Sequence, residues 1–528
     1  MGSTPEYKKP KRIFEDTGSV YPGSAYCVDL ENVVSNRNQD LKTLIDCGRY
    51  FCIFAPRQSG KTTFFERFCH RLEKDPTYIP VLLSFQSFRN IPKQQFYELI
   101  KDDLQEQLIN RLETIKCSET AIVRTCLESI RLVDHIAFKK LFEELNRFIS
   151  HKKIVIFIDE FDGIPRDELE NFLTALRDLY QKYKSRNHKA LYSIGLVGIR
   201  NITKLIVGGI SPFNIADHVK LPCFTLKNVR DLYAQYTEET KQPFSEEALK
   251  KVYDETGGQP WLVSRLGTIL TIDIKPETTE PITAEDVEKA VNILLYEENS
   301  HFDNITEKAK QHKETFIDIV FNGVEFVPGD EAQSLLMTHG LVKACEHDLH
   351  VSNPIYKKRF TKTFFREVSK NIDVAAGRYY LPDSKLKMDQ ILTDFEKYIA
   401  QIGAAAFYST RNPMEVTGKF QLTAWLYQFV SGGAGDLFYE SRTGLGIMDI
   451  MLIHGRTRYI IEIKINRYSG TLDDALEQLT ERYLLPQRID HGYIVLFDPK
   501  IRVGELCTPQ IHQVGVNKVL SFNIGIGT

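Results

Sequence analysis

The chain has 528 residues, of which 42% are hydrophobic and 26% charged, and its formal net charge is −3. This composition is typical of a globular protein with two to four domains. Because the net charge is so close to zero, the overall field of the protein is excluded as the source of any nucleic-acid binding, which must come from local basic patches.

No apolar run reaches membrane-spanning length, and residues 1–12 lack the apolar stretch of a secretory signal. Nine cysteines, an odd number with no Cys-x-x-Cys pair, predict a reducing compartment and no zinc ribbon. We therefore expect a cytoplasmic protein without a membrane partner. The basic stretch Lys8–Arg12 predicts a solvated N-terminal tail, with a nuclear-import patch as the alternative.

A phosphate-binding loop is predicted after the first strand. The sequence YFCIFAPRQSGKTT combines a strand, Tyr50–Phe54, with a helix, Thr62–Leu72, and fits the pattern G-x-x-x-x-G-K-[ST] except that Ala55 replaces the first glycine. Backbone N–H groups and the helix N-terminus would hold the phosphates. Lys61 would reach the β- and γ-phosphates of ATP, and Thr62 would bind Mg²⁺. The predicted loop comprises Ala55, Pro56, Arg57, Gln58, Ser59, Gly60, Lys61, Thr62 and Thr63.

A second motif of nucleotide hydrolysis follows about a hundred residues later. The apolar run Ile154–Ile158 predicts a buried parallel strand that ends in Asp159 and Glu160. Asp159 would hold the Mg²⁺ shell, and Glu160 would polarise the attacking water. Further strands are predicted at Val81–Phe85 and Tyr192–Ile199, and Arg200, directly after the last, is a candidate γ-phosphate sensor or an ordinary surface residue.

Four stretches between residues 192 and 356 resemble one family: SIGLVGIRN, SPFNIAD, TGGQPWLVSRL and VSNPIY. In this order they are similar to AAA-type ATPase domains, related to STAND and archaeal ATPases, that are often fused to PD-(D/E)XK nucleases. The resemblance implies an α/β P-loop NTPase with a parallel sheet. It also implies an N-terminal extension (1–40), an ATPase core (41–222), a helical lid (223–300), a winged-helix domain (301–370) and a linker (371–387).

Residues 356–370, YKKRFTKTFFREVSK, combine basic and aromatic side chains on one predicted short helix. Phosphate contacts from these lysines and arginines would give salt-dependent nucleic-acid binding. The alternative is a solvated helix whose aromatic residues pack against the wing.

Two apolar runs near the C-terminus each carry one acid. Ile447–Ile453 and Arg458–Ile465 predict a β-hairpin, and a four-residue loop at 454–457 would place Asp449 opposite Glu462. Opposed carboxylates repel each other unless Mg²⁺ or Mn²⁺ lies between them. Lys464 leaves the same face of the strand as Glu462 and could orient water or stabilise a transition state. The alternative is an ordinary hairpin with one polar face.

This segment resembles the PD-(D/E)XK nuclease superfamily in Gly446–Asp449, Glu462–Lys464 and the pair Gln478 and Tyr483. The resemblance implies a restriction-endonuclease-like α/β domain at residues 388–528. Gln478 and Tyr483 are five residues apart, whereas the RecB-like branch has them four apart. Glu415, before an expected helix Phe420–Val430, is either the superfamily's first-helix acid or an ordinary N-terminal acid. With the ATPase motifs included, the candidate catalytic residues of the chain are Glu160, Asp449, Glu462, Lys464 and Gln478, and the candidate metal ligands are Thr62, Asp159, Asp449 and Glu462.

Two functions follow as hypotheses. The first is an ATP-binding and ATP-hydrolysing, Mg²⁺-dependent nuclease in which the ATPase module regulates cleavage of nucleic acid, with DNA favoured over RNA, in defence or mobile-element biology. The second is a STAND-like signalling ATPase whose nuclease fold serves as a binding module. The sequence leaves the oligomeric state open, a homo-oligomer included.

Overall fold

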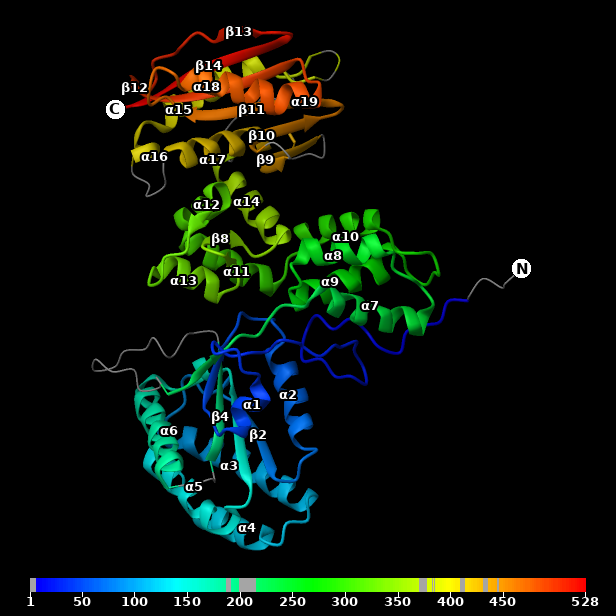
Figure 1. Cartoon of the computed structure of the whole chain (residues 1–528), viewed down its shortest axis with the longest axis vertical. Helices are drawn as coiled ribbons and strands as arrows, with labels where there is room; N and C mark the ends of the chain where they lie inside the picture. The colour runs from blue at the N-terminus through cyan, green and yellow to red at the C-terminus, as the bar shows by residue number, and fades with distance from the viewer. Residues whose placement is uncertain are drawn as a thin grey trace. The chain divides into compact units, whose positions relative to one another are not determined.

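The computed structural model describes residues 6–186, 191–198, 215–369, 378–381, 383, 385–408, 414–430, 435–443 and 446–528 (Figure 1). The chain folds into two compact units. Unit 1 contains residues 1–303, 338–340 and 353–355, and unit 2 contains residues 304–337, 341–352 and 356–528.

Unit 1 contains a five-stranded sheet in the order β2-β3-β4-β1-β5, and all of its strand pairs are parallel. Its two central strands β3 and β4 are buried almost throughout, as expected for a parallel sheet covered on both faces. The expected parallel-sheet α/β fold of the N-terminal part is thereby confirmed. The strands are β1 (Phe51–Phe54), β2 (Tyr78–Ser84), β3 (Lys153–Asp159), β4 (Leu191–Gly198) and β5 (Asp217–Val219).

Helices cover both faces of this sheet. Side chains of α3, α4, α5 and α6 form one hydrophobic cluster with the strands, and those of α1 and α2 form the other. Figure 1 shows α5 and α6 on one side of the strands and α2 on the other. The helices are α1 (Leu41–Asp46), α2 (Lys61–Leu72), α3 (Lys93–Thr114), α4 (Thr120–Ser129), α5 (His135–Ile149), the short 3-10 helix η1 (Phe161–Gly163) and α6 (Arg166–Arg186).

Helices follow the sheet within unit 1, and we call them the lid because the resemblance implies a helical lid at this place. Gly257 and Gly258 have φ of +57° and +72° and end one helix, and Pro260 begins the next, so the chain breaks where glycine and proline favour it. The lid consists of α7 (Leu226–Thr240), α8 (Glu246–Thr256), α9 (Pro260–Thr268), the π-helix η3 (Ile269–Ile274) and α10 (Ala284–Tyr296).

Unit 2 begins with helices and a small antiparallel sheet in the order β6-β8-β7. Strands β7 and β8 pair antiparallel, and we call the elements of this part, where the resemblance implies a winged helix, the winged-helix elements. The basic helix is longer than expected, because it starts at Pro354. The elements are α11 (Ser300–Gln311), α12 (Lys313–Asn322), β6 (Val324–Glu325), α13 (Glu331–Thr338), β7 (Val342–Cys345), β8 (Asp348–Val351) and α14 (Pro354–Ser369).

The rest of unit 2 is built on a six-stranded mixed sheet in the order β13-β14-β12-β11-β10-β9. Helices α15 and α17 pack on one face of it, and α18 with the π-helix η4 packs on the other. The strands are β9 (Gly435–Thr443), β10 (Gly446–His454), β11 (Thr457–Ile465), β12 (His491–Arg502), β13 (Gln510–Val514) and β14 (Asn517–Gly527). The helices are α15 (Met388–Ile402), α16 (Ala405–Tyr408), α17 (Met414–Tyr427), α18 (Thr471–Glu477), η4 (Gln478–Leu484) and α19 (Leu485–Gln487).

Two local expectations for this sheet need correction. The hairpin loop has two residues, Gly455 and Arg456, because His454 and Thr457 pair with each other. Ile453 nevertheless pairs with Arg458, so the predicted register is confirmed. The helix expected to begin at Phe420 begins at Met414, which places Glu415 inside its first turn instead of before it.

The winged-helix elements pack against the C-terminal sheet domain inside unit 2. Phe321 of α12 stacks on Tyr439 of β9 with ring centroids 5.1 Å apart, and Phe365 of α14 lies 5.8 Å from Phe420 of α17. The Tyr439 hydroxyl donates to Thr361 Oγ1 over 2.8 Å. Phe365 of the basic helix thus packs against the C-terminal sheet domain, whereas the packing alternative from the sequence expected contact with the wing.

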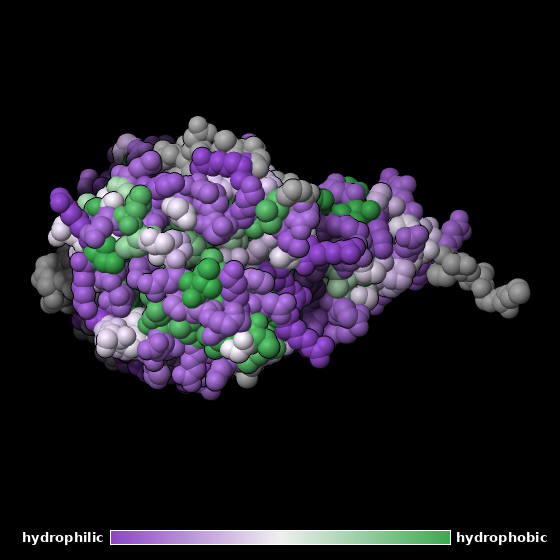
Figure 2. Space-filling model, turned by 90° about the horizontal axis from the view of Figure 1, so that it is seen from above, coloured by the Kyte–Doolittle hydropathy of each residue, from purple (hydrophilic) through white to green (hydrophobic). Residues whose placement is uncertain are grey.

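On the face seen in Figure 2, hydrophilic side chains predominate and hydrophobic ones lie in small groups between them. Within the described ranges, no helix combines the length and the apolar character that crossing a membrane requires.

The aromatic interface of unit 2 gives a prediction about stability. Phe365→Ala should lower the free energy of unfolding of unit 2 by about 3 kcal/mol, because it leaves a cavity among buried rings. Phe438→Ala is the matched control, since this ring is 41% exposed. Chemical denaturation of the full chain measures both, and equal effects of the two changes would contradict the importance of the interface.

Candidate functional site

The loop between β1 and α2 has the backbone geometry of a phosphate cradle. Gly60 has φ of +78° and directly precedes α2, and Gln58 has φ of +57°. A Cβ added to Gly60 would meet no atom within 4 Å, so the space beside the helix N-terminus is open. Ala55 is not among the residues with positive φ, and this is why alanine is tolerated where the motif has glycine.

Lys61 lies almost buried at the start of α2. Its Nζ donates to the carbonyl oxygens of Ala55 at 3.1 Å and Pro56 at 2.7 Å. Burial lowers the pKa of this ammonium, and the charges of Glu160 and Asp159 act in the opposite direction. Lys61 makes no ion pair with a carboxylate among the described residues. Its positive charge is therefore held inside the loop by neutral carbonyl oxygens. An anionic ligand could replace these oxygens as the partner of the ammonium.

The two motif acids lie at the carboxyl end of β3, beside this loop. Asp159 is buried, accepts a hydrogen bond from Thr62 Oγ1 at 2.6 Å, and accepts a second from the Glu160 amide at 2.8 Å. Glu160 is half-buried and has φ of +49°, in the left-handed region. A hydroxyl and a carboxylate in contact supply the oxygen donors that Mg²⁺ takes next to a nucleotide phosphate. These residues therefore fit a magnesium–nucleotide complex.

A cavity of about 840 Å³ adjoins these residues. Its lining combines the loop, the acids of β3, the lid and, unexpectedly, the N-terminal segment. Arg89, which follows β2 and is exposed, also lines it, and sequence reasoning missed this residue. Arg200, the candidate γ-phosphate sensor, lies outside the described residues. The lining residues from the other elements include Glu15 to Val20, Tyr26 to Leu30, Phe224, Trp261 and Ser264.

The N-terminal segment is not a solvated tail. The Asp16 carbonyl accepts from Trp261 Nε1 at 2.7 Å, and the Asp16 carboxylate pairs with Arg265 at 3.1 Å. The Val20 amide donates to Thr63 Oγ1 at 3.1 Å, so the segment contacts both the lid and α2. The expectation failed because residues 6–30 have little periodic pattern, and their partners are more than forty positions away along the chain.

Within the basic stretch itself, three residues have partners on the lid, and the first is Lys8, whose amide donates to the Thr240 carbonyl oxygen at 3.0 Å. Arg12 forms an ion pair with Glu239 at 2.7 Å, and the Lys11 amide donates to the same carboxylate at 3.1 Å. The Tyr26 hydroxyl also donates to Glu239, at 2.9 Å. The Arg12 side chain and the backbone amide of Lys11 thus attach this stretch to the lid.

A second cluster of charges lies in the C-terminal sheet. Continuing the register by one position beyond Ile450–Ile461 places Asp449 of β10 opposite Glu462 of β11. Glu462 is fully buried; Lys464 Nζ lies 2.7 Å from its Oε1, yet neither carboxylate oxygen makes a hydrogen bond of good geometry with a described group. Burial, followed by the charge of Asp449, raises the pKa of Glu462. A buried acid with unsatisfied oxygens beside a second acid is a donor set that fits a divalent cation.

Helix α17 supplies two charged residues that sequence reasoning weighted too little or missed. Lys419 Nζ lies 2.9 Å from Asp449 Oδ1 and 3.3 Å from Glu415 Oε1. Glu415, for which the sequence leaves the superfamily acid and an ordinary N-terminal acid open, thus belongs to the same charge cluster through Lys419. The signal for Lys419 was its spacing of four residues from Glu415, which puts both on one helix face.

The spacing of Gln478 and Tyr483 has a structural explanation. Residues 478–484 form the π-helix η4, in which residues five apart lie on one face. Gln478 Nε2 lies 3.5 Å from the buried Tyr483 hydroxyl. Burial in the first place, and then the charges of Glu462 and Asp449, raises the pKa of Tyr483. The π-helix accommodates the extra residue between Gln478 and Tyr483, so the two side chains remain in contact.

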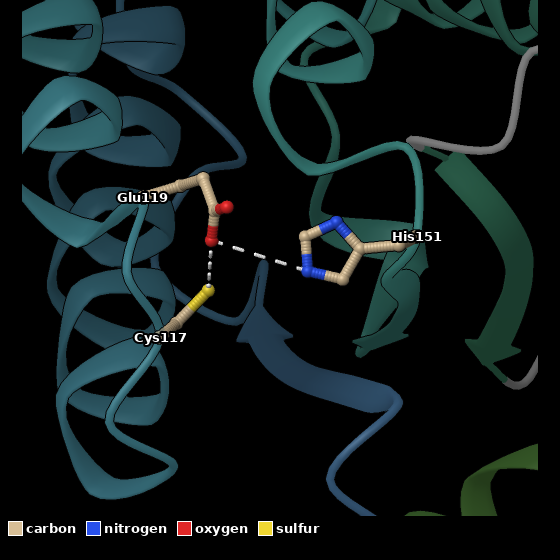
Figure 3. Close-up of side chains that lie close together, drawn as sticks. All are labelled: Cys117, Glu119 and His151. Atoms are coloured by element: carbon tan, nitrogen blue, oxygen red, sulfur yellow. Dashed lines mark hydrogen bonds and ion pairs between the residues drawn. The ribbon is translucent and has the colours of Figure 1, made fainter.

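A third group of metal-binding residue types lies near the amino end of β3, away from Asp159 at the carboxyl end. Figure 3 shows Cys117 and Glu119 close to His151. Cys117 Sγ donates to Glu119 Oε2 at 3.0 Å, and His151 Nε2 lies 4.0 Å from that oxygen. The group offers three donors where a structural zinc site has four, and His151 is exposed. We interpret it as a surface hydrogen-bonded group at the start of α4.

Comparison with known proteins covers most of unit 1. A family model described as an AAA-like domain matches residues 31–362. An uncharacterized WD repeat-containing protein of Synechocystis sp. is 24% identical over 347 residues, which cover 61% of this chain and 28% of that protein. The chain thus spans less than a third of the length of this relative.

Solved structures with similar folds include a Walker-type ATPase of Pyrococcus abyssi, with a TM-score of 0.44 and 12% identity, covering 63% of this chain and 99% of that one. They also include the Orc1 protein of Aeropyrum pernix in complex with DNA, with a TM-score of 0.29 and 12% identity, covering 64% and 95%.

The attachment of the N-terminal segment can be tested at two neighbouring residues. Phe14 is buried against Tyr26, Tyr233 and Tyr236, whereas Ile13 is 56% exposed. Phe14→Ala should cost about 3 kcal/mol of local stability and make residues 6–29 sensitive to limited proteolysis. Ile13→Ala should change neither, and unaltered proteolysis of the Phe14 variant would show that the segment is held elsewhere.

Proposed function

Because the chain belongs to the AAA-like domain family, whose model covers residues 31–362, we propose that unit 1 binds and hydrolyses ATP. The contact between Thr62 and Asp159 beside the open N-terminus of α2 is the observation that carries this proposal. Lys61 would exchange its two carbonyl partners for phosphate oxygens, and the first N–H groups of α2 would complete the cradle. Thr62 and Asp159 would hold Mg²⁺.

Glu160 is the proposed catalytic residue of hydrolysis. It follows Asp159 at the strand end and lines the same cavity as the phosphate loop. Its carboxylate would orient and polarise the attacking water, while Lys61 and the helix N-terminus stabilise the charge on the phosphates. The base would lie between the lid and the N-terminal segment, since Trp261 and residues 15–20 line the remaining part of the cavity.

The ATPase proposal separates binding from turnover. Lys61→Ala should abolish nucleotide binding, because it removes the buried positive charge of the loop. Glu160→Gln should bind ATP normally and hydrolyse it about 10² to 10⁴ times more slowly, the range expected for loss of a general base. Fluorescent-nucleotide binding and phosphate release measure the two steps, with Lys42→Ala as a control on the surface of α1. Normal turnover by Glu160→Gln would remove Glu160 from the mechanism.

We further propose that the acidic cluster of unit 2 is a Mg²⁺- or Mn²⁺-dependent nuclease site of the PD-(D/E)XK type. The fully buried Glu462, opposite Asp449 and without satisfied oxygens, is the observation that supports it. A divalent cation bound by these two acids would act as a Lewis acid toward a phosphodiester. Lys464 would orient the attacking water and stabilise the developing negative charge. Gln478, paired with Tyr483 across the π-helix, would position the substrate or the lysine.

The chemistry of the acidic cluster gives phosphodiesters, which occur in both DNA and RNA, as the substrate class. Of the two we propose DNA as the substrate, with the ATP-bound state of unit 1 regulating cleavage. The competing function is a signalling ATPase whose C-terminal fold is a binding module. The ion pair between Lys419 and Asp449 favours this alternative, because a lysine already partners one of the two acids.

Cleavage and metal binding together test the nuclease proposal. Asp449→Asn and Lys464→Ala should each reduce cleavage of DNA in Mg²⁺ by about 10² to 10⁴, whereas only Asp449→Asn should also lose stabilisation by Mn²⁺. Asp490→Asn serves as a control because this residue is exposed and lies outside the cluster. Assays of the full chain would use DNA and RNA with ATP, with ADP and without nucleotide. Cleavage by Asp449→Asn at the wild-type rate would leave the binding-module function as the better one.

A further inference from the structure

We propose that the ammonium of Lys419 occupies the acidic site of unit 2 in place of a metal ion. Lys419 must leave Asp449 before a divalent cation can bind there. This inference rests on the proposed nuclease function. It assigns to Lys419, a residue outside the E-x-K motif, control over the metal affinity of the site.

The two carboxylate oxygens of Asp449 have different partners. Its Oδ2 accepts a hydrogen bond from the backbone amide of Ile463 at 2.8 Å. Its Oδ1 lies 2.9 Å from Lys419 Nζ, and the two side chains are only 6% and 11% exposed. The oxygen not held by the backbone is therefore the one that Lys419 contacts. A metal ion that used this oxygen would compete directly with the lysine.

The net charge of the cluster also favours exchange of Lys419 for a metal ion. Among the described side chains, Glu415, Asp449 and Glu462 face two ammonium groups, those of Lys419 and Lys464. When all five are ionised, the cluster has one net negative charge. A divalent cation added to it would leave one net positive charge, and withdrawal of Lys419 would return the net charge to zero. Charge balance in a poorly solvated site thus favours exchange of the lysine for the metal.

The two lysines differ in how they are held. Lys464 lies on β11, two residues from Glu462, so its position relative to that acid is set by one strand. Lys419 lies on α17, a separate element from the strands that carry both acids.

The winged-helix elements fix the position of α17. Phe420, directly after Lys419, lies 6.1 Å from the ring of Phe321 and 5.8 Å from that of Phe365. Both partner rings belong to the helices of the winged-helix region. A shift of these helices would therefore move Lys419 relative to Asp449, and this gives unit 2 a route by which its own packing sets metal affinity.

The decisive experiment is metal binding by the full chain, measured by calorimetric titration with MnCl₂ and MgCl₂. Lys419→Gln and Lys419→Met should bind Mn²⁺ more tightly than wild type by roughly tenfold or more, since a competing charge-assisted contact is gone. Lys397→Gln is the matched control, because Lys397 pairs with a different acid, Asp394, at 2.9 Å. Affinities equal to or weaker than wild type in both Lys419 variants would overturn the inference.

A second measurement uses the wild-type protein and needs no variant to fold. Acetylation of lysine amines, followed by mass spectrometry, should show greater modification of Lys419 with Mn²⁺ than without it, while Lys397 remains unchanged. Protection of Lys419 that is the same in both conditions would contradict its release.

Asp449→Asn separates the two proposals. If this variant binds Mn²⁺ as wild type does, the acidic site is not the metal site, and both the nuclease function and the role of Lys419 fail. If it loses binding while the Lys419 variants gain no affinity, the nuclease function stands and the inference about Lys419 alone is wrong.

Discussion

Charged groups that leave water need partners, because an unpaired buried charge costs several kcal/mol, and both sites of this chain are arranged around that constraint. In unit 1, carbonyl oxygens hold the ammonium of Lys61, and Asp159 accepts from a hydroxyl and an amide. In unit 2, Lys419 contacts Asp449, and Lys464 is the ion-pair partner of Glu462 among the described residues. We assign phosphate binding to Lys61, whose partners are neutral carbonyl oxygens, and metal binding to Glu462, whose oxygens make no hydrogen bond of good geometry with a described group.

The elements that carry these charges also carry the packing of each unit. Helix α2 begins with Lys61 and Thr62 and continues with phenylalanines that cover one face of the parallel sheet. Helix α17 presents Lys419 to the acidic cluster and Phe420 to the rings of the winged-helix region. The hydrophobic contacts one residue or one turn away therefore hold the functional side chains of both helices in place.

Departures from the expected motifs have local physical explanations. Alanine replaces the first glycine of the phosphate loop at a position without positive φ, so a Cβ is tolerated there. Glutamine and tyrosine are one residue further apart than the resemblance predicts, and a π-helix accommodates the extra residue while keeping the two side chains within 3.5 Å. Spacing along the chain is thus a poor guide to contact wherever the helical period changes.

The sequence by itself determined the features that depend on neighbours along the chain. Strand, glycine-containing loop and helix followed from residues 50–72, and the register of β10 with β11 followed from two apolar runs and a short turn, although the turn proved two residues shorter. These features need only backbone conformation and the alternation of side chains, which a short segment specifies.

Only the tertiary structure decided which distant groups meet. The N-terminal segment binds the lid through Asp16, Arg12 and Phe14, although its sequence has little periodic pattern. Lys419 reaches Asp449 from another element, thirty residues earlier in the chain. Such contacts depend on how helices pack on a sheet, and that packing is set by buried side chains from the whole unit. A charge pattern in one segment identifies a residue able to form an ion pair, but its partner is chosen by the fold.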